Sequence, residues 1–565
     1  MSGVLGATFW QETTEQHTEP QALAAARARS VARARSARAL LDRRGDLPLD
    51  WYDERLYMGV VDRSGVDSDL RGQQPYAARD GGAVVAVDGS LIGARSLRRE
   101  LGSQAFRGNG AAEIILRGYR RWGTQELLRR LRGQFAFALY DRRDGRLVLA
   151  RDALGSRPLY YRMGRDGVQF ASELRVLRQL LDEAPPIDNT AAFDFLTYGY
   201  VPAPKTLYRD VQKLRAGHWL DMDLNRGAAS LHCHWAPQRT AASGQTESDF
   251  VSRGSELLGR AFDDRRAPGR DALFSDFGSA LGDLCATRAG ANNAPAARSG
   301  SDAAPSFESD CRDWFDEPAL TVDLAARADA LAALGVSASV VLCDVGLPIL
   351  CGAAPRYGVT RAGRWRQRLR STLRREDGAT GVDRADLFER YGVALGGLPR
   401  PARDAQREVW QLPDDYDDHW LFAAHFFPEF SESADAVGAG GAETPDAIVG
   451  ALQRLDLATL VPDRLLTELD RVGTRAGVEI RAPFLDQDLL DWILAAPPAL
   501  APPAFDLAVA LLPGAAGGSM LQRMSGRLQR TGRRLRDRVG AARTTAASAE
   551  RLVRLGAQYP EFDSA

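Results

Sequence analysis

Histidine and cysteine are the residues best suited to bind a metal ion, and they stand together at His232, Cys233 and His234. On a β-strand, residues two apart share a face, so both imidazoles could reach one ion. No second group of histidines or cysteines lies nearby in the sequence, and we therefore expect no metal site. The five cysteines are odd in number and scattered, which argues against a disulfide framework.

Arginine is the other residue type whose spacing could do chemistry. Residues 23–46 carry seven arginines among alanines, and residues 523–543 carry eight with one acidic residue. Helices of this kind can bind RNA phosphates, acidic proteins or an anionic membrane surface. Neither stretch has interleaved aromatic residues, so we interpret both as solvated helices and do not expect nucleic-acid binding.

The composition indicates the class of protein in which these residues lie. The chain has 565 residues, 45% hydrophobic and 26% charged, with a net charge of −1. These values are typical of a soluble globular protein with at least two domains. A net charge so close to zero excludes an overall positive electrostatic field that would attract nucleic acid. Lys205 and Lys213 are the two lysines beside 71 arginines. We find no signal peptide and no membrane span, and we expect a cytoplasmic protein.

The first 175 residues mix strand and helix patterns. Residues 83–93 form a β-rich run, whereas 96–101 and 112–123 show helical spacing of apolar residues. Residues 135–152 and 158–173 predict two hairpins, each around a turn that contains Asp-Gly. Successive hairpins and helices indicate a layered α+β domain.

Four regions divide the chain. We expect a first domain over 1–185, a connector over 186–245, a second domain over 246–512 and a basic tail over 513–565. A low-complexity stretch between Cys285 and Phe307 predicts a disordered loop, and residues 431–446 predict a second loop.

Five segments together resemble the asparagine synthetase family of glutamine-dependent amide-forming ligases, whose relatives include β-lactam synthetases and lasso peptide cyclases. The segments are LRGQFAFALYD (131–141), LVLARDALGSRPLYY (147–161), FASELRVL (170–177), TYGYVPAPKTLYRDVQKLRAGHWL (197–220) and PDRLLTELDRVGTRAGVEIRAPFLDQDLLDW (462–492). The resemblance implies an α+β N-terminal-nucleophile sandwich of the class II glutamine amidotransferase type. It implies a second, α/β ATP-pyrophosphatase-like domain, here shortened and largely helical.

The family's glutaminase residues are changed at the positions that match. Ser2 stands where the family has a nucleophilic cysteine at the new N-terminus. Asp88 and Gly89 align with an Asn-Gly pair that donates to the oxyanion, and a carboxylate there repels where a donor should stabilise. Ala111 replaces an aspartate for the glutamine amine, and the segment that holds the glutamine carboxylate has no counterpart. We therefore expect no glutamine hydrolysis.

The ATP site implied by the resemblance is changed as well. Its phosphate-cradling loop corresponds to residues 275–280, where Ser275, Gly278 and Ser279 are remnants and Asp276-Phe277 replace paired glycines. In the second loop Gly346 remains, but Pro348-Ile349 align with the acidic Mg²⁺ ligands. No lysine follows Lys213, so the family's phosphate-binding lysine is missing too.

The surviving motif residues form a different class. Asp470, Arg471, Glu479, Arg481 and Asp486 persist in the last segment. In active relatives this segment lies beside the acceptor site, so Glu479 could be an acid or a base. We favour a buried ion-pair network that fixes helix packing.

The sequence thus predicts a family member without glutaminase or ATP chemistry and without a cofactor. It would be an accessory protein, partnering an active ligase or another biosynthetic enzyme. The alternative is an ATP-dependent amide-bond-forming ligase, of asparagine synthetase or lasso cyclase type, with a rebuilt site that uses Mg-ATP.

Overall fold

The fold is described from a computed structural model, which covers the two domains in several stretches of the chain. The described residues are 2–8, 20–41, 47–62, 74–102, 106–108, 110–164, 167–238, 247–267, 271–275, 296–298, 316–318, 324–335, 339–346, 349, 391, 395, 397–407, 411–413, 416–417, 420–421 and 445–495.

The N-terminal domain is a sandwich of two six-stranded sheets. The first has the order β10-β8-β9-β1-β3-β2, and its strands are β1 (Gly3–Thr8), β2 (Leu47–Tyr52), β3 (Leu56–Asp62), β8 (Tyr160–Gly164), β9 (Gly167–Ala171) and β10 (Val211–Lys213). The second has the order β12-β11-β7-β6-β5-β4, and its strands are β4 (Tyr76–Ala77), β5 (Ala83–Ile92), β6 (Arg132–Asp141), β7 (Arg146–Arg151), β11 (His218–Asp223) and β12 (Ala228–Cys233). Alternate apolar side chains such as Val4, Met58 and Leu149 fill the space between the sheets.

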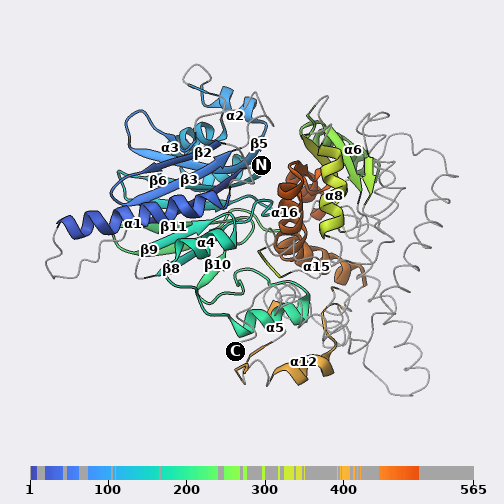
Figure 1. Cartoon of the computed structure of the whole chain (residues 1–565). Coiled ribbons are helices and arrows are strands. Elements are labelled where there is room, and N and C mark those ends of the chain that lie inside the picture. Colours follow the sequence, from blue (N-terminus) through green and yellow to red (C-terminus); the bar gives the residue numbers. More distant parts are fainter. Residues whose placement is uncertain are drawn as a thin grey trace, which may run out of the picture.

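Helices cover the outer faces of this sandwich, and α1 runs across one of them (Figure 1). On the first sheet lie α1 (Pro20–Ala39) and α4 (Leu174–Leu180), and on the second lie α2 (Ala94–Glu100) and α3 (Ala111–Arg130). Gly123, with φ 74°, breaks the helical backbone inside α3. Beyond α4, the first sheet's outer core continues into α5 (Asn189–Tyr198), which Asp188 caps.

The hairpins expected from the sequence are confirmed. Strands β6 and β7 pair antiparallel around a turn in which Gly145 has φ 64°, and β8 pairs antiparallel with β9. The expected strand over 83–93 is β5, and the expected helices are α2 and α3. Strands β10, β11 and β12, which come from the stretch expected as a connector, extend both sheets.

The first arginine-rich stretch forms the helix α1. Its buried side consists of small or branched residues, including Val31, Ala34 and Ala37. Its arginines form ion pairs within the domain: Arg35 and Arg38 lie 2.9 and 3.1 Å from Asp50. The second stretch, together with the whole 513–565 tail, lies outside the described residues.

The second domain is built on a parallel four-stranded sheet with the order β14-β13-β15-β16. Its strands are β13 (Asp271–Ser275), β14 (Ala296–Arg298), β15 (Val340–Cys343) and β16 (Glu479–Arg481). Its helices and helical turns are α6 (Glu247–Asp263), α8 (Leu324–Gly335), α12 (Arg400–Arg407), α15 (Pro445–Ala458), η6 (Val461–Leu465), α16 (Leu466–Ala476), η7 (Pro483–Leu485) and α17 (Gln487–Leu494). This parallel sheet with helices is the α/β layer expected for the second domain.

Both expected loops of this domain need correction where they are described. Residues 296–298, inside the stretch predicted to be disordered, form β14, because a strand needs only backbone partners and β13 supplies them. The end of the second predicted loop begins α15, with Pro445 at the first helical position. The remainder of both stretches lies outside the described residues.

The two domains meet at α16. The N-terminal end of the chain lies on the side of the sandwich that faces this helix (Figure 1). Motif residues from both domains therefore lie close together beside α16.

Candidate functional site

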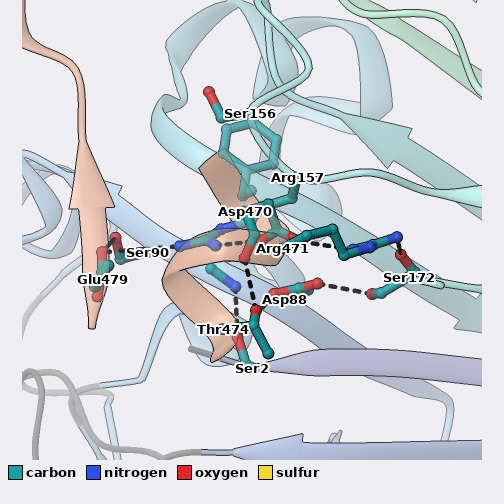
Figure 2. A network of polar contacts seen from close by, with 12 residues as sticks. Ser2, Asp88, Ser90, Ser156, Arg157, Ser172, Asp470, Arg471, Thr474 and Glu479 are labelled. Atoms are coloured by element: carbon teal, nitrogen blue, oxygen red, sulfur yellow. Dashed lines mark hydrogen bonds and ion pairs between the residues drawn. The ribbon is translucent and has the colours of Figure 1, made fainter. Parts of the chain in front are cut away.

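Ser2 and Asp88 form the centre of a buried polar site. Ser2 precedes β1 and Asp88 lies on β5, in the facing sheet. The Ser2 hydroxyl donates to Asp88 Oδ1 at 3.0 Å and accepts from the Gly89 N–H at 2.7 Å (Figure 2). The Ser172 hydroxyl donates to the other carboxylate oxygen at 2.7 Å. The chain itself therefore satisfies the carboxylate and the hydroxyl that the family resemblance places at an oxyanion donor and a nucleophile.

This arrangement has a clear chemical consequence. Ser2 is 4% exposed and Asp88 is fully buried. A carboxylate within hydrogen-bond reach of a hydroxyl has the geometry of a general base. The same carboxylate is an acceptor, however, and cannot donate to a developing oxyanion as an amide would.

Gly89 is required by packing, whereas its hydrogen bond to Ser2 uses only the backbone N–H. It has φ 111°, and a Cβ at this position would lie 1.9 Å from the carbonyl oxygen of Gln134 on β6. The β5 and β6 backbones thus approach too closely for a side chain. This glycine is consequently no sign of oxyanion chemistry on its own.

Arg157 connects this centre to the second domain. It lies in the loop between β7 and β8, and its Nη1 is 2.7 Å from Asp470 Oδ1 of α16. Its Nη2 is 4.0 Å from Glu479 Oε1 of β16. Burial opposes the charge, but the carboxylates of Asp470, Asp88 and Glu479 raise the pKa of Arg157 above its usual value. Arg157 is a charged link between the domains.

Glu479 is held as an anion. It accepts from Arg481 Nε at 3.0 Å and from the Ser90 hydroxyl at 3.1 Å. Burial alone would raise its pKa, but the guanidinium groups of Arg481 and Arg157 lower it to about 2. A carboxylate with this pKa is a poor proton carrier at neutral pH.

Asp470 and Arg471 complete the α16 side of the network. Arg471 Nη1 lies 2.7 Å from Asp470 Oδ2, and Arg471 Nη2 donates to the Ser172 carbonyl at 3.2 Å. Both side chains are buried. The network in Figure 2 therefore runs without a break from Ser2 through Ser172 to α16.

Asp316 and Glu317 join the domains in a way that the sequence did not reveal. Asp316 Oδ1 lies 2.8 Å from Arg471 Nε. Glu317 Oε2 lies 2.5 Å from Lys213 Nζ, and its other oxygen accepts from the Tyr160 hydroxyl. These three partners of the acidic pair are buried, and they belong to α16 or to the first sheet.

The signals for these missed residues differ. Lys213 is one of two lysines in the chain, and Arg157 lies in a segment that resembles the family. Asp316 and Glu317 follow a low-complexity stretch, and no pattern in the sequence marks them.

The remnants of the ATP site are only partly described. Ser275 is the last residue of β13, while Gly278 and Ser279 lie outside the described residues. Gly346 follows β15 with φ 93°, and a Cβ there would lie 2.4 Å from Leu485. Close packing thus explains this glycine without a phosphate. Asp486 pairs with Arg265 at 2.9 Å and accepts from the Leu489 N–H at the start of α17.

The histidines near the end of the first domain have separate partners. His232 Nε2 contacts the Ser230 hydroxyl at 2.8 Å, and its ring stacks on Trp219. His234 Nε2 contacts the Arg151 carbonyl at 3.0 Å. Among the residues that the structure describes, no group of three histidine, cysteine or acidic side chains is arranged to hold a metal ion. Within the same residues, no helix has both the length and the apolar character to cross a bilayer.

Two small cavities lie between the domains, lined in common by Gln134, Ser156, Leu466 and Ala482. Their volumes are about 10 and 20 Å³. Such spaces hold one or two water molecules, whereas ligand pockets are far larger. Neither cavity is lined by Ser2 or Asp88.

Sequence profiles of two known domain families match this chain. The sequence profile of a glutamine amidotransferase domain matches residues 1–235, and that of asparagine synthase matches residues 350–501. Together they match more than half of the chain, in the order of the two domains. The chain belongs to the asparagine synthetase family.

Individual relatives of the family share only part of the chain. A putative glutamine-hydrolysing asparagine synthetase from Mycobacterium bovis is 36% identical over 180 residues, which is 31% of this chain and 27% of the relative. Asparagine synthetase 1 of Bacillus subtilis is 32% identical over 169 residues, covering 30% of this chain and 26% of that protein. The match thus spans about a quarter of the length of these relatives.

Among solved structures, the chain is similar to the glutamine phosphoribosylpyrophosphate amidotransferase of B. subtilis. The TM-score is 0.28 and the identity 15%, over 60% of this chain and 80% of that one. The fold of the family is an N-terminal-nucleophile sandwich of the amidotransferase type followed by the asparagine synthase domain.

Proposed function

We propose that this protein is a non-catalytic member of the asparagine synthetase family that assists an active ligase. The observation that carries the proposal is the hydrogen bond from the Ser2 hydroxyl to the buried Asp88 carboxylate. By the family resemblance, the Asp88 carboxylate thus occupies the position at which the amidotransferase reaction develops negative charge. Losing one oxyanion donor alone costs about 3–4 kcal/mol of transition-state stabilisation.

The neighbourhood of Ser2 supports the same conclusion. Its oxygen already accepts from Gly89, and its proton is directed at Asp88. Ala111, which aligns with the family's residue for the glutamine amine, is the first residue of α3 and carries no charge. A glutamine substrate would therefore meet neither its nucleophile in a free state nor its usual anchor.

In the ATP half, the sequence itself lacks the residues of a nucleotide site. Asp276 and Phe277 stand in the phosphate loop, Pro348 and Ile349 stand where acidic metal ligands are expected, and no lysine follows Lys213. Backbone N–H groups cradle phosphate only where side chains permit close approach. We infer that the protein binds neither ATP nor Mg²⁺ there and works through a protein partner, in the cytoplasm.

Two assays on the full chain test the proposal. We expect no glutamate release above background from glutamine, and no saturable Mg-ATP binding by calorimetry. Glutamate release that disappears in Ser2→Ala would refute the first part. Saturable nucleotide binding with ATP–pyrophosphate exchange would instead favour an amide-bond-forming ligase.

A rebuilt variant sharpens the first assay. The double change Ser2→Cys with Asp88→Asn restores the nucleophile and the donor type together. Single changes serve as controls, because each leaves one half of the site altered. Glutamate release confined to the double variant would show that these two positions suffice to silence the site.

A further inference from the structure

The two helices on the outer face of the second sheet carry far more positive than negative charge. Residues 94–130, which include α2 and α3, contain nine arginines and three glutamates, with no lysine and no aspartate. The whole chain, by contrast, has a net charge of −1. Apolar side chains such as Leu97 and Leu127 of the two helices belong to one core with the second sheet, so most of the arginines lie on the outer side. A local positive face thus stands on a nearly neutral protein.

The three glutamates of this stretch neutralise only a small part of the face. Glu113 is buried and binds Arg117 at 2.9 Å. Glu100 and Glu126 both pair with the same arginine, Arg130. Among the residues that the structure describes, the arginines of this stretch that form no ion pair are Arg98, Arg99, Arg107, Arg121 and Arg129. These guanidinium groups are fully or partly exposed and can meet an external anion.

Aromatic rings hold several of these arginines in place. Two rings of the stretch each lie beside two guanidinium groups, which cation–π attraction favours. The pairs are Arg98 and Arg117 at 4.4 and 4.7 Å from the centre of Phe106, and Arg121 and Arg130 at 5.9 and 4.7 Å from the centre of Trp122. Arg121 Nη1 also donates to the Glu100 carbonyl at 2.8 Å, which links α3 to α2. A side chain that is already ordered loses less entropy when it binds a ligand.

We propose that this arginine face, formed by the arginines of residues 94–130, binds a carboxylate-rich segment of a partner protein. The inference rests on the proposed function, because it names the surface through which a non-catalytic protein would meet its partner. The planar guanidinium group presents its N–H donors as a fork that matches the two oxygens of a carboxylate. Several ordered forks on one face therefore suit a run of aspartate or glutamate side chains.

Two observations favour carboxylates over nucleic acid at this face. Proteins that bind single strands stack bases on open aromatic rings, whereas Phe106 and Trp122 are occupied by the chain's own arginines. Nucleic-acid binding also draws on an extended positive field, and the net charge of −1 supplies none. The arginine face is thus a local recognition surface for an acidic protein segment.

Fluorescence anisotropy of the full chain with a labelled oligoglutamate peptide tests this inference. We expect saturable binding at about 50 mM salt, which Arg99→Glu with Arg121→Glu weakens at least about tenfold. Arg226→Glu with Arg253→Glu is the matched control, because it changes the net charge equally at exposed arginines outside residues 94–130. An oligothymidylate of equal charge should bind more weakly than the peptide. Absence of peptide binding, equal effects of the two double variants or tighter binding of the oligothymidylate would overturn the proposal.

Site-directed alkylation gives a second readout that leaves every arginine in place. In a Cys233→Ser background, a bromoacetyl oligoglutamate should alkylate Ser96→Cys, at an exposed position of α2, faster than Ser230→Cys, at an exposed position of β12. Circular dichroism checks that each variant is folded, and equal alkylation rates would refute the inference. Neither readout contains glutamine or ATP. Absence of peptide binding would therefore refute this inference alone, whereas turnover of glutamine or ATP would refute the proposed function.

Discussion

At the scale of single residues, Asp88 determines the role of the polar groups that contact it. Two serine hydroxyls donate to its two oxygens, and it is fully buried. A buried carboxylate persists only when its acceptor sites are filled. Ser2 and Ser172 thus act as structural hydrogen-bond donors, even though Ser2 stands at the family's nucleophile position.

The hydroxyl of Ser2 should therefore matter for stability. We expect Ser2→Ala to lower the free energy of unfolding by about 1–3 kcal/mol, since it leaves Asp88 Oδ1 without this donor. Chemical denaturation measures the change. Ser36→Ala, at an exposed serine of α1, is the control and should shift it by less than about 0.5 kcal/mol. Equal effects would contradict a structural role for Ser2.

Glu479 gives a prediction for pH dependence. Because its pKa is lowered to about 2 in the folded protein, it stabilises the fold above its ordinary pKa of 4.5. That contribution is lost as the pH falls from about 4.5 towards 2. Glu479→Gln should be less stable than the wild type at neutral pH, and the difference should shrink over this range in denaturation curves. A difference that stays constant with pH would refute this explanation.

At the scale of elements, the close pairing of β5 and β6 sets the shape of the site. Gly89 opposes Phe135, and Gly133 opposes Leu91, so the strands approach closely at two points. A Cβ on Gly133 would lie 2.3 Å from the Ser90 carbonyl oxygen. The pair of glycines fixes the backbone that presents Asp88 to Ser2.

Substituting Gly89 separates close approach from backbone strain. Gly89→Ala combines a φ of 111° with a clash at 1.9 Å, and we expect a loss of about 3–5 kcal/mol. Gly93 also has a positive φ, 69°, but a Cβ there would meet no atom within 4 Å. Gly93→Ala should cost only about 1 kcal/mol. Calorimetric unfolding compares them, and similar losses would show that packing is not decisive.

The elements were largely predictable and the network was not. Alternating side chains and the Asp144-Gly145 turn indicate the β6–β7 hairpin, because both signals are local. Arg157 and Asp470 are 313 residues apart, and Arg471 and Asp316 are 155 apart. No local pattern records such pairs. The family resemblance pointed to Asp470, Arg471 and Glu479, but their hydrogen-bond and ion-pair partners could be identified only from the structure.

At the scale of the whole molecule, buried ion pairs connect the two domains through residues 316 and 317. Asp316 holds Arg471 of α16, and its neighbour Glu317 holds Lys213 at the end of β10. Removing one partner of a buried ion pair costs about 3–5 kcal/mol, since the other charge stays buried. Residues 316–317 therefore couple the stability of both domains.

Neutralising this acidic pair should uncouple the domains. We expect the wild type to unfold in a single calorimetric transition and Asp316→Asn with Glu317→Gln to unfold in two, the first at lower temperature. Asp404→Asn is the control, because Asp404 is exposed and lies 3.6 Å from Arg400, one turn away in the same helix. A single transition at an unchanged temperature in the double variant would contradict the coupling.

The scarcity of lysine makes this coupling visible to a protease. A lysine-specific endoprotease has two sites in the chain, after Lys205 and after Lys213. Lys205 is bound to Asp194 at 2.8 Å, and Lys213 is buried against Glu317. Both ion pairs lie where the sandwich meets the second domain. The rate of digestion therefore reports how often the domains separate, without any label being attached.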